Sequence, residues 1–201
     1  MHSFTRRHLL RGLSGGAAVC GWPMLLGAQT TGHGLLGPVD PRPTAPGLPL
    51  TLHDGRPTRL EHLLRGRLTA LQLMFTGCSS TCPIQGAVFA GLQQRLAEAR
   101  LPAVQLLSVS IDPLGDDARA LAAWRQRFHA GEQWLAAVPP LALAERLPDF
   151  LASRPTPGKG ADGHTPQVYL FDRQGRLAYR MAELASATSI VKALGELARL
   201  G

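Results

Sequence analysis

The sequence has few cysteines, few lysines, few aromatic residues and no long apolar run. Three cysteines in 201 residues exclude a disulfide-dense mini-scaffold. No uninterrupted stretch of about 18 apolar residues occurs, which excludes a polytopic membrane protein. Charged residues make up only 17% of the chain and hydrophobic residues 45%, so a solvating, disordered chain is also excluded. The length and composition therefore predict one domain with a buried core.

The charge is basic but dispersed. Lysine and arginine number 21 against 14 acidic residues, which gives a net charge of +7. Only Lys159 and Lys192 are lysines, and the arginines are spread along the chain without a dense basic stretch after the first dozen residues. A nucleic-acid-binding domain concentrates its basic residues, so we expect no nucleic-acid partner.

The first 47 residues carry two segments that we exclude from the folded domain. Residues 1–28 place Arg6 and Arg7 before a weakly apolar, glycine-broken stretch, which resembles a twin-arginine (Tat) export signal. This predicts a periplasmic protein, attached to the membrane only if the signal stays uncleaved as an anchor. Residues 29–47 are rich in proline and predict an extended linker, so we expect the domain to span residues 48–201.

Hydrophobic patterning within residues 48–201 predicts alternating strands and helices. Two apolar runs, Leu68–Phe75 and Val104–Ile111, are typical of strands buried on both faces. The other expected elements are a hairpin over Leu48–Leu64, a helix from Pro83, a helix capped by Asp116 or Asp117 and ending at Phe128, a helix over Leu141–Leu151, a hairpin formed by Gln167–Phe171 and Arg176–Arg180, and a last helix opened by Ser186 or Ser189. That last helix should bury Ile190, Val191, Leu194, Leu197 and Leu200. This order predicts an α/β thioredoxin-like fold, with a mixed central sheet flanked by helices and an N-terminal β-hairpin.

The most informative motif is Cys78-Ser79-Ser80-Thr81-Cys82-Pro83, between a buried strand and a helix. Helix N-termini stabilise thiolates, and sites in α/β sheets gather where the strands end. Three interpretations remain open. The pair is a structural disulfide, a redox-active dithiol, or part of a soft-metal site for Cu(I) or Zn(II) that needs one or two further ligands.

A further ligand would come from a histidine. His53, His62 and His129 lie where surface histidines are expected, whereas His164 directly precedes the strand Gln167–Phe171. The loop that contains His164 also contains Gly158, Gly160 and Gly163, which would let it approach the cysteines. Position alone leaves His164 open as either a ligand or an ordinary loop residue.

Three blocks of the sequence resemble the SCO/SenC family, in order and with plausible spacing. They are Phe75-Thr76-Gly77-Cys78-Ser79-Ser80-Thr81-Cys82-Pro83, then Ser108-Val109-Ser110-Ile111-Asp112-Pro113, and then Gly163-His164-Thr165 followed by Tyr169-Leu170-Phe171-Asp172-Arg173-Gln174-Gly175. The resemblance implies a thioredoxin-like fold and copper binding through Cys78, Cys82 and His164. It also implies copper delivery to the CuA centre of cytochrome c oxidase, although some members act mainly as thiol reductants or in copper-linked signalling.

This chain departs from the family pattern beside the ligands. Ser79 and Ser80 stand between the cysteines where relatives often have an acidic, amide or proline residue, and Gly163 replaces the usual aspartate before the histidine. The leading hypothesis is a copper-binding assembly factor rather than a strict enzyme. Its expected partners are a cuproprotein acceptor, such as the CuA-bearing oxidase subunit, and a thiol reductase.

Two alternatives are kept. In the first, the chain is a thiol–disulfide oxidoreductase in which Cys78 attacks and Cys82 resolves the mixed disulfide. In the second, the chain is a docking domain whose cysteines form an inert bridge.

Overall fold

Alternating apolar runs and helical segments build one sheet with helices on both faces. The structure is a computed structural model that describes residues 36–101, 104–152 and 166–200, all within the compact unit of residues 31–201. The predicted signal (residues 1–28), the start of the predicted linker and His164 lie outside the described residues.

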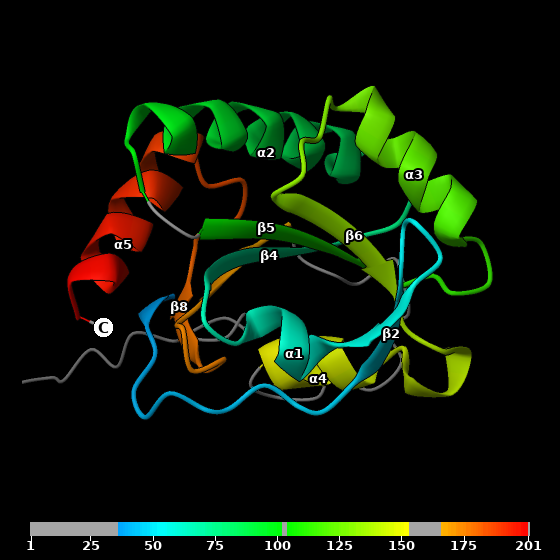
Figure 1. Cartoon of the computed structure of the whole chain (residues 1–201), viewed down its shortest axis with the longest axis horizontal. Coiled ribbons are helices and arrows are strands. Elements are labelled where there is room, and N and C mark those ends of the chain that lie inside the picture. Colours follow the sequence, from blue (N-terminus) through cyan, green and yellow to red (C-terminus); the bar gives the residue numbers. More distant parts are fainter. Residues whose placement is uncertain (1–35, 102–103, 153–165, 201) are drawn as a thin grey trace, which may run out of the picture. The chain divides into compact units, whose positions relative to one another are not determined.

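Eight strands form a single mixed sheet (Figure 1). In chain order they cover Gly37–Pro38 (β1), Pro49–Leu52 (β2), Pro57–Arg59 (β3), Leu68–Met74 (β4), Val104–Ser110 (β5), Trp134–Val138 (β6), Val168–Phe171 (β7) and Leu177–Arg180 (β8). Their order across the sheet is β1-β8-β7-β4-β5-β6-β2-β3. β4 runs parallel to β5 and β5 parallel to β6, whereas β7 is antiparallel to β4. The predicted mixed sheet with an N-terminal hairpin is therefore confirmed.

The two central strands are buried at every residue, as their continuous apolar runs predict. Strand β6 was not predicted. It has only five residues, two of them alanine, a residue depleted in strands, so its pattern does not stand out.

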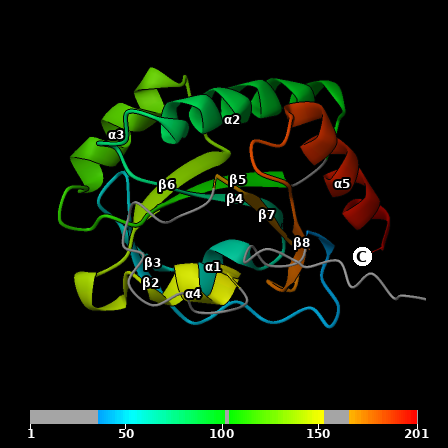
Figure 2. The ribbon, with the colours of Figure 1, turned by 180° about the vertical axis from the view of Figure 1, so that it is seen from behind.

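Helices cover the two faces of the sheet and enclose separate cores (Figures 1 and 2). The helices are α1 (Leu60–Leu64), α2 (Thr81–Glu98), α3 (Ala118–Arg127), α4 (Arg146–Ala152) and α5 (Ala187–Leu200). Helices α2, α3 and α5 pack over one core, in which the Trp134 ring lies 5.6 Å from Phe89 and 5.4 Å from Trp124. Helices α1 and α4 cover the other core, which is mainly leucine.

Three details of the predicted helices were wrong. Residues 141–151 do not form one helix, because Pro148 cannot sit in a helix interior. A 3-10 turn over Leu141–Leu143 is followed instead by α4, with Pro148 in its first turn, where the missing N–H is tolerated. Helix α2 begins at Thr81 rather than Pro83. Leu200, expected in the core, is exposed at the end of α5.

The second part of the predicted linker, residues 36–47, lies along the domain. β1 pairs with β8, the Leu177 N–H donates to the Pro43 carbonyl at 2.9 Å, and Ala45 is buried. Proline is tolerated here because an edge segment can accept hydrogen bonds without donating any. We call residues 36–47 the N-terminal strap.

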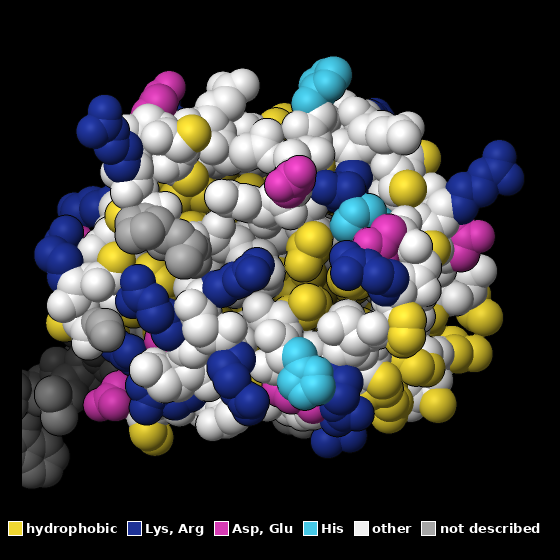
Figure 3. Space-filling view, in the orientation of Figure 1, with side chains coloured by type: hydrophobic (Ala, Val, Ile, Leu, Met, Phe, Trp, Pro, Cys, Tyr) yellow, Lys and Arg dark blue, Asp and Glu magenta, His cyan; other side chains and the backbone are white. Residues whose placement is uncertain are grey.

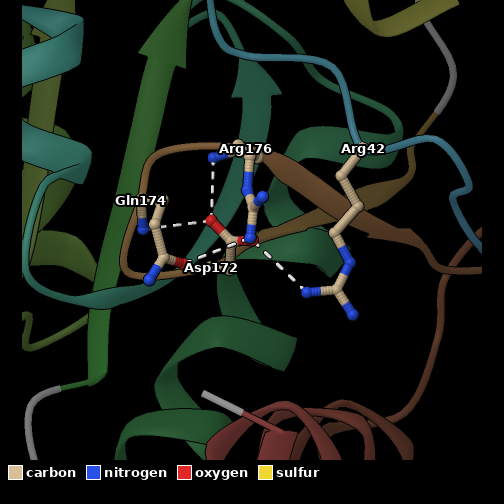
Figure 4. A network of polar contacts seen from close by, with 4 residues as sticks. All are labelled: Arg42, Asp172, Gln174 and Arg176. Carbon is tan, nitrogen blue, oxygen red and sulfur yellow. Dashed lines mark hydrogen bonds and ion pairs between the residues drawn. The ribbon is translucent and has the colours of Figure 1, made fainter.

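The strap is fastened to the hairpin between β7 and β8 through Asp172 (Figure 4). Arg42 of the strap donates to the Asp172 carboxylate at 3.3 Å, and the Arg176 Nε donates to it at 3.0 Å. The backbone N–H groups of Gln174 and Arg176 add two more hydrogen bonds. Asp172 therefore joins the strap and both arms of the hairpin.

Charged and hydrophobic side chains are distributed differently over the visible surface. Figure 3 shows arginine and lysine side chains spread across this face, at its left, lower centre and right. Hydrophobic side chains gather at the lower right, near the segment between β6 and α4. Within residues 36–101, 104–152 and 166–200, no helix has both the length and the apolar character of a membrane span.

Candidate metal centre

The two cysteines lie where β4 leaves the sheet and α2 begins. β4 ends at Met74, Cys78 lies in the connecting loop, and Cys82 lies in the first turn of α2. Cys78 is partly exposed, Cys82 is only 3% exposed, and both are free thiols. The structure thus places both cysteines at the carboxyl edge of the sheet, after the buried strand and at the start of the helix.

The connecting loop folds back so that Cys78 faces the start of α2. The Cys82 N–H donates a hydrogen bond to the Cys78 sulfur at 3.4 Å, and the Ser80 hydroxyl lies 3.7 Å from the same sulfur. The Cys78 N–H in turn donates to the Phe75 carbonyl at 3.3 Å. The Cys78 sulfur thus occupies the N-terminus of α2, where unpaired N–H groups favour negative charge.

The two thiols ionise in opposite directions. Partial burial opposes ionisation of Cys78, but hydrogen bonds from Cys82 and Ser80 outweigh it and lower the pKa of Cys78 to about 6. Burial raises the pKa of Cys82 to about 12, reinforced by neighbouring Cys78 and Asp116 and opposed by a backbone hydrogen bond involving Phe75. Near neutral pH the pair therefore combines one thiolate with one protonated thiol.

A buried aspartate supports this loop from the neighbouring strand. The Asp116 carboxylate, 5% exposed, accepts the Thr76 N–H at 3.1 Å and the Ser110 hydroxyl at 2.6 Å, and it also accepts the Thr76 hydroxyl. The sequence left Asp116 and Asp117 as equal candidates for capping α3. The structure separates them, because Asp117 caps the helix by accepting the Ala120 N–H at 2.7 Å.

A second polar contact joins α2 to the start of β7. The Gln85 amide donates to the Gln167 carbonyl at 3.1 Å, and both side chains are buried. Gln72 of β4 is paired with Val168, so the described chain resumes at Pro166 beside the end of β4. Sequence analysis missed Gln85, although a glutamine one turn after Cys82 on the buried side of α2 is a detectable signal.

The predicted third ligand, His164, lies outside the described residues. The other candidates lie elsewhere in the fold: His53 contacts the Ala136 carbonyl, His62 belongs to α1 and His129 follows α3. Among the described residues, no three histidine, cysteine or acidic side chains are grouped as metal ligands would be. Cys78 and Cys82 thus provide two soft donors, a set that suits Cu(I) or Zn(II) and needs a further ligand.

A protein-family comparison covers most of the chain. The model of the SCO1/SenC family matches residues 43–199, a range that includes the end of the N-terminal strap. Among curated proteins, the mitochondrial Protein SCO2 homolog of Mus musculus is 35% identical over 78 residues. That match covers 38% of this chain and only 30% of the mouse protein.

Solved structures match over a longer range. A SCO1/SenC family lipoprotein from Bacillus anthracis is 26% identical, with a TM-score of 0.66 over 80% of this chain and 97% of that one. Arabidopsis thaliana ScoI, solved with copper bound, is 15% identical, with a TM-score of 0.66 over 78% of this chain and 99% of that one. These likenesses confirm the predicted thioredoxin-like fold. With a family model matched over more than three quarters of its length, this chain belongs to the SCO1/SenC family.

Proposed function

We propose that this protein binds copper through Cys78, Cys82 and His164 and passes it to a cuproprotein during assembly of cytochrome c oxidase. The Sco family is described as a family of cytochrome c oxidase assembly proteins, and the plant relative ScoI binds copper. The observation that carries the proposal is the pair of free thiols at the open edge of the sheet, one partly exposed and one buried. The acceptor we propose is the CuA-bearing oxidase subunit.

The donor set favours Cu(I). Two cysteine sulfurs are soft ligands, and an imidazole completes a low-coordinate site. His164 is our choice for the imidazole because the described chain resumes at Pro166, beside the end of β4, where the Gln85–Gln167 contact fastens it to the cysteine helix. A site with few ligands exchanges them readily with an acceptor, whereas a closed four-cysteine cage would retain the metal.

The two thiols would play unequal parts in loading and release. Cys78 is the first ligand to bind because its lowered pKa makes it a thiolate at neutral pH. Cys82 must lose its proton to bind, so copper loading releases a proton and weakens as pH falls. Because Cys78 is partly exposed, its sulfur is the one that a thiol of the acceptor can approach first.

We further propose that residues 1–28 export the chain to the periplasm. There an oxidised Cys78–Cys82 pair would lose the copper site until a thiol reductase restored it. The relatives described above include a bacterial lipoprotein and a mitochondrial protein, which supports a site of action on the outer side of an energy-transducing membrane.

A thiol–disulfide reductase is the second candidate function. The same pair of pKa shifts favours it, because an exposed thiolate next to a buried thiol is the arrangement of an attacking and a resolving cysteine. A reductase has little use for His164, so this histidine separates the two candidates.

The test is a Cu(I) competition titration of the reduced full-length chain against a chromophoric chelator. We expect one copper per chain, lost in Cys78→Ser and Cys82→Ser and weakened at least about tenfold in His164→Ala. His129→Ala is the matched control, since His129 lies beyond α3, and it should bind like the parent. Weak binding by the parent would overturn the copper proposal and favour the reductase. Equal binding by the two histidine variants would remove His164 from the site.

A further inference from the structure

We propose that Asp116 is a positioning residue for the cysteine site. Its buried carboxylate ties the end of β4 to the end of β5 and thereby holds the loop in which Cys78 faces the N-terminus of α2. The effect of Asp116 on copper binding rests on the proposed function. Its effect on the position and reactivity of Cys78 does not depend on that function.

The carboxylate is fully committed to the loop and the neighbouring strand. One oxygen accepts the Ser110 hydroxyl at 2.6 Å, and the Thr76 N–H lies 3.1 Å and 3.2 Å from the two oxygens. The Thr76 hydroxyl adds a further hydrogen bond. Hydrogen bonds to a charged acceptor are the stronger kind, and a buried carboxylate needs all of them. Thr76 is therefore held firmly, two residues before Cys78.

Hydrogen bonds within the loop that carries Asp116 hold its backbone in place. Besides donating to Asp116, the Ser110 hydroxyl accepts the Asp112 N–H at 3.0 Å, and the Asp116 N–H donates to the Asp112 carbonyl at 2.8 Å. The Asp112 side chain accepts the Gly115 N–H at 3.1 Å. A Cβ at Gly115 would lie only 2.4 Å from an Asp112 carboxylate oxygen, so a side chain at this position would displace the Asp112 carboxylate from the turn.

The contacts that Cys78 makes within the connecting loop are long: its N–H donates to the Phe75 carbonyl at 3.3 Å, and the Ser80 hydroxyl lies 3.7 Å from its sulfur. Gly77 has no side chain, and Ser79 and Ser80 are exposed. The hydrogen bond from the Cys82 N–H to the Cys78 sulfur is long, at 3.4 Å, so a small displacement of the loop would break it. The anchored Thr76, two residues before Cys78, thus adds the firmest attachment of this loop and helps to keep the Cys78 sulfur over the helix.

The test compares Asp116→Asn with Asp117→Asn in the full-length chain. Asparagine keeps the shape of aspartate but replaces one acceptor oxygen with an NH₂ group that faces the donors. Asp117→Asn is the matched control, because it removes the same charge one residue away and asparagine is also a good helix cap. Alkylation of Cys78 by iodoacetamide is followed between pH 4 and 10 by mass spectrometry of the peptide that contains it, and Cu(I) affinity is measured by chelator competition.

We expect Asp116→Asn to move the alkylation midpoint of Cys78 upward and to weaken Cu(I) binding about tenfold, while Asp117→Asn matches the parent. The direction is decisive. Loss of the anchor weakens the hydrogen bond to the sulfur and raises the midpoint, whereas mere loss of a negative charge would lower it. An unchanged or lowered midpoint would overturn the proposal.

Two further measurements decide the role of Asp116 if the Asp116→Asn variant does not fold or the parent binds no copper. If Asp116→Asn does not fold, Ser110→Ala removes one of the donors but leaves the carboxylate, and it should raise the midpoint by a smaller amount. No rise in that variant would overturn the proposal. If the parent binds no copper, the proposed function fails, and the alkylation midpoints alone still decide the role of Asp116.

Discussion

Two buried aspartates stand at opposite edges of the sheet and are used in different ways. Asp116, at the edge where β4 and β5 end, accepts hydrogen bonds from neutral groups of Thr76 and Ser110. Asp172, between β7 and β8, accepts from the guanidinium groups of Arg176 and Arg42 as well as from backbone N–H groups. Both carboxylates are 5% exposed.

The difference in partners decides what each carboxylate does. Burial opposes ionisation of Asp172, but hydrogen bonds and charge from Arg176 and Arg42 prevail and lower its pKa. Its charge is neutralised locally, and its effect is to fasten the N-terminal strap to the hairpin. Among the residues that the structure describes, no cation pairs with Asp116, and its charge contributes to the raised pKa of Cys82. The carboxylate of Asp172 therefore joins the strap to the hairpin. The carboxylate of Asp116 instead acts on the ionisation and position of the two thiols.

The largest difference that we expect is between the alkylation rates of the two thiols near Asp116, those of Cys78 and Cys82. At pH 7, Cys78 should react with iodoacetamide more than about a hundredfold faster than Cys82, because only Cys78 is a thiolate there. The rate at Cys78 should fall as pH drops through about 6. Peptide mass spectrometry of the reduced chain measures both rates. Comparable rates at pH 7 would mean that the two environments are not distinct.

The second largest effect that we expect is the loss of stability when Asp172 is replaced. Asp172→Ala leaves two backbone N–H groups and two partly exposed arginines without their acceptor, so we expect the free energy of unfolding to fall by about 2 kcal/mol. Urea denaturation measures it. Asp54→Ala is the control, since Asp54 pairs with Arg56 at the surface and should change stability by no more than about 0.5 kcal/mol. The alkylation midpoint of Cys78 should stay that of the parent in both variants, and a shift in Asp172→Ala would break the comparison.

The pH dependence of stability should carry the signature of Asp172. Because its pKa is lower in the folded protein than the value of about 3.9 in an unfolded chain, its ionised form stabilises the fold. This contribution is complete above about pH 4 and is lost as pH falls through the folded-state pKa. Urea denaturation between pH 2 and 7 should therefore show a shallower acid loss for Asp172→Asn than for the parent. Parallel curves would contradict the assignment.

The smallest change in stability that we expect comes from replacing Arg42, the residue of the strap that contacts Asp172. The Arg42 side chain is 30% exposed, and its contact with Asp172 is 3.3 Å long. Arg42→Ala should thus destabilise the protein by only about 0.5–1 kcal/mol, and less at high salt. Urea denaturation at two salt concentrations tests this. A loss as large as that of Asp172→Ala would mean that the strap, rather than the hairpin, depends on the aspartate.

Much of the fold was predictable because its strands are buried on both faces. The runs that became β4 and β5 could be identified directly, as could the hairpin around Asp172–Gly175. Errors arose where local pattern and packing disagree. In α2 the apolar residues Ile84, Val88, Leu92 and Leu96 recur every four residues, which predicts that they share the buried face. Ile84 is nevertheless 52% exposed, whereas Phe89, outside this series, is fully buried. A spacing of four drifts around a helix of 3.6 residues per turn, and only the position of the sheet selects the buried face.

By itself, the sequence determined which chemistry is available: two thiols after a buried strand and before a helix, in a chain with an α/β pattern. Tertiary structure decided what surrounds them. Asp116 and Asp117 are adjacent and chemically identical, and only the turn built by Asp112 and Gly115 sends one carboxylate to Thr76 and leaves the other to cap α3. The N-terminal strap was likewise not predictable, because it is held by backbone hydrogen bonds with residues more than 100 positions away, such as the one that Pro43 accepts from Leu177. Contacts between distant segments follow from packing, and no local pattern encodes them.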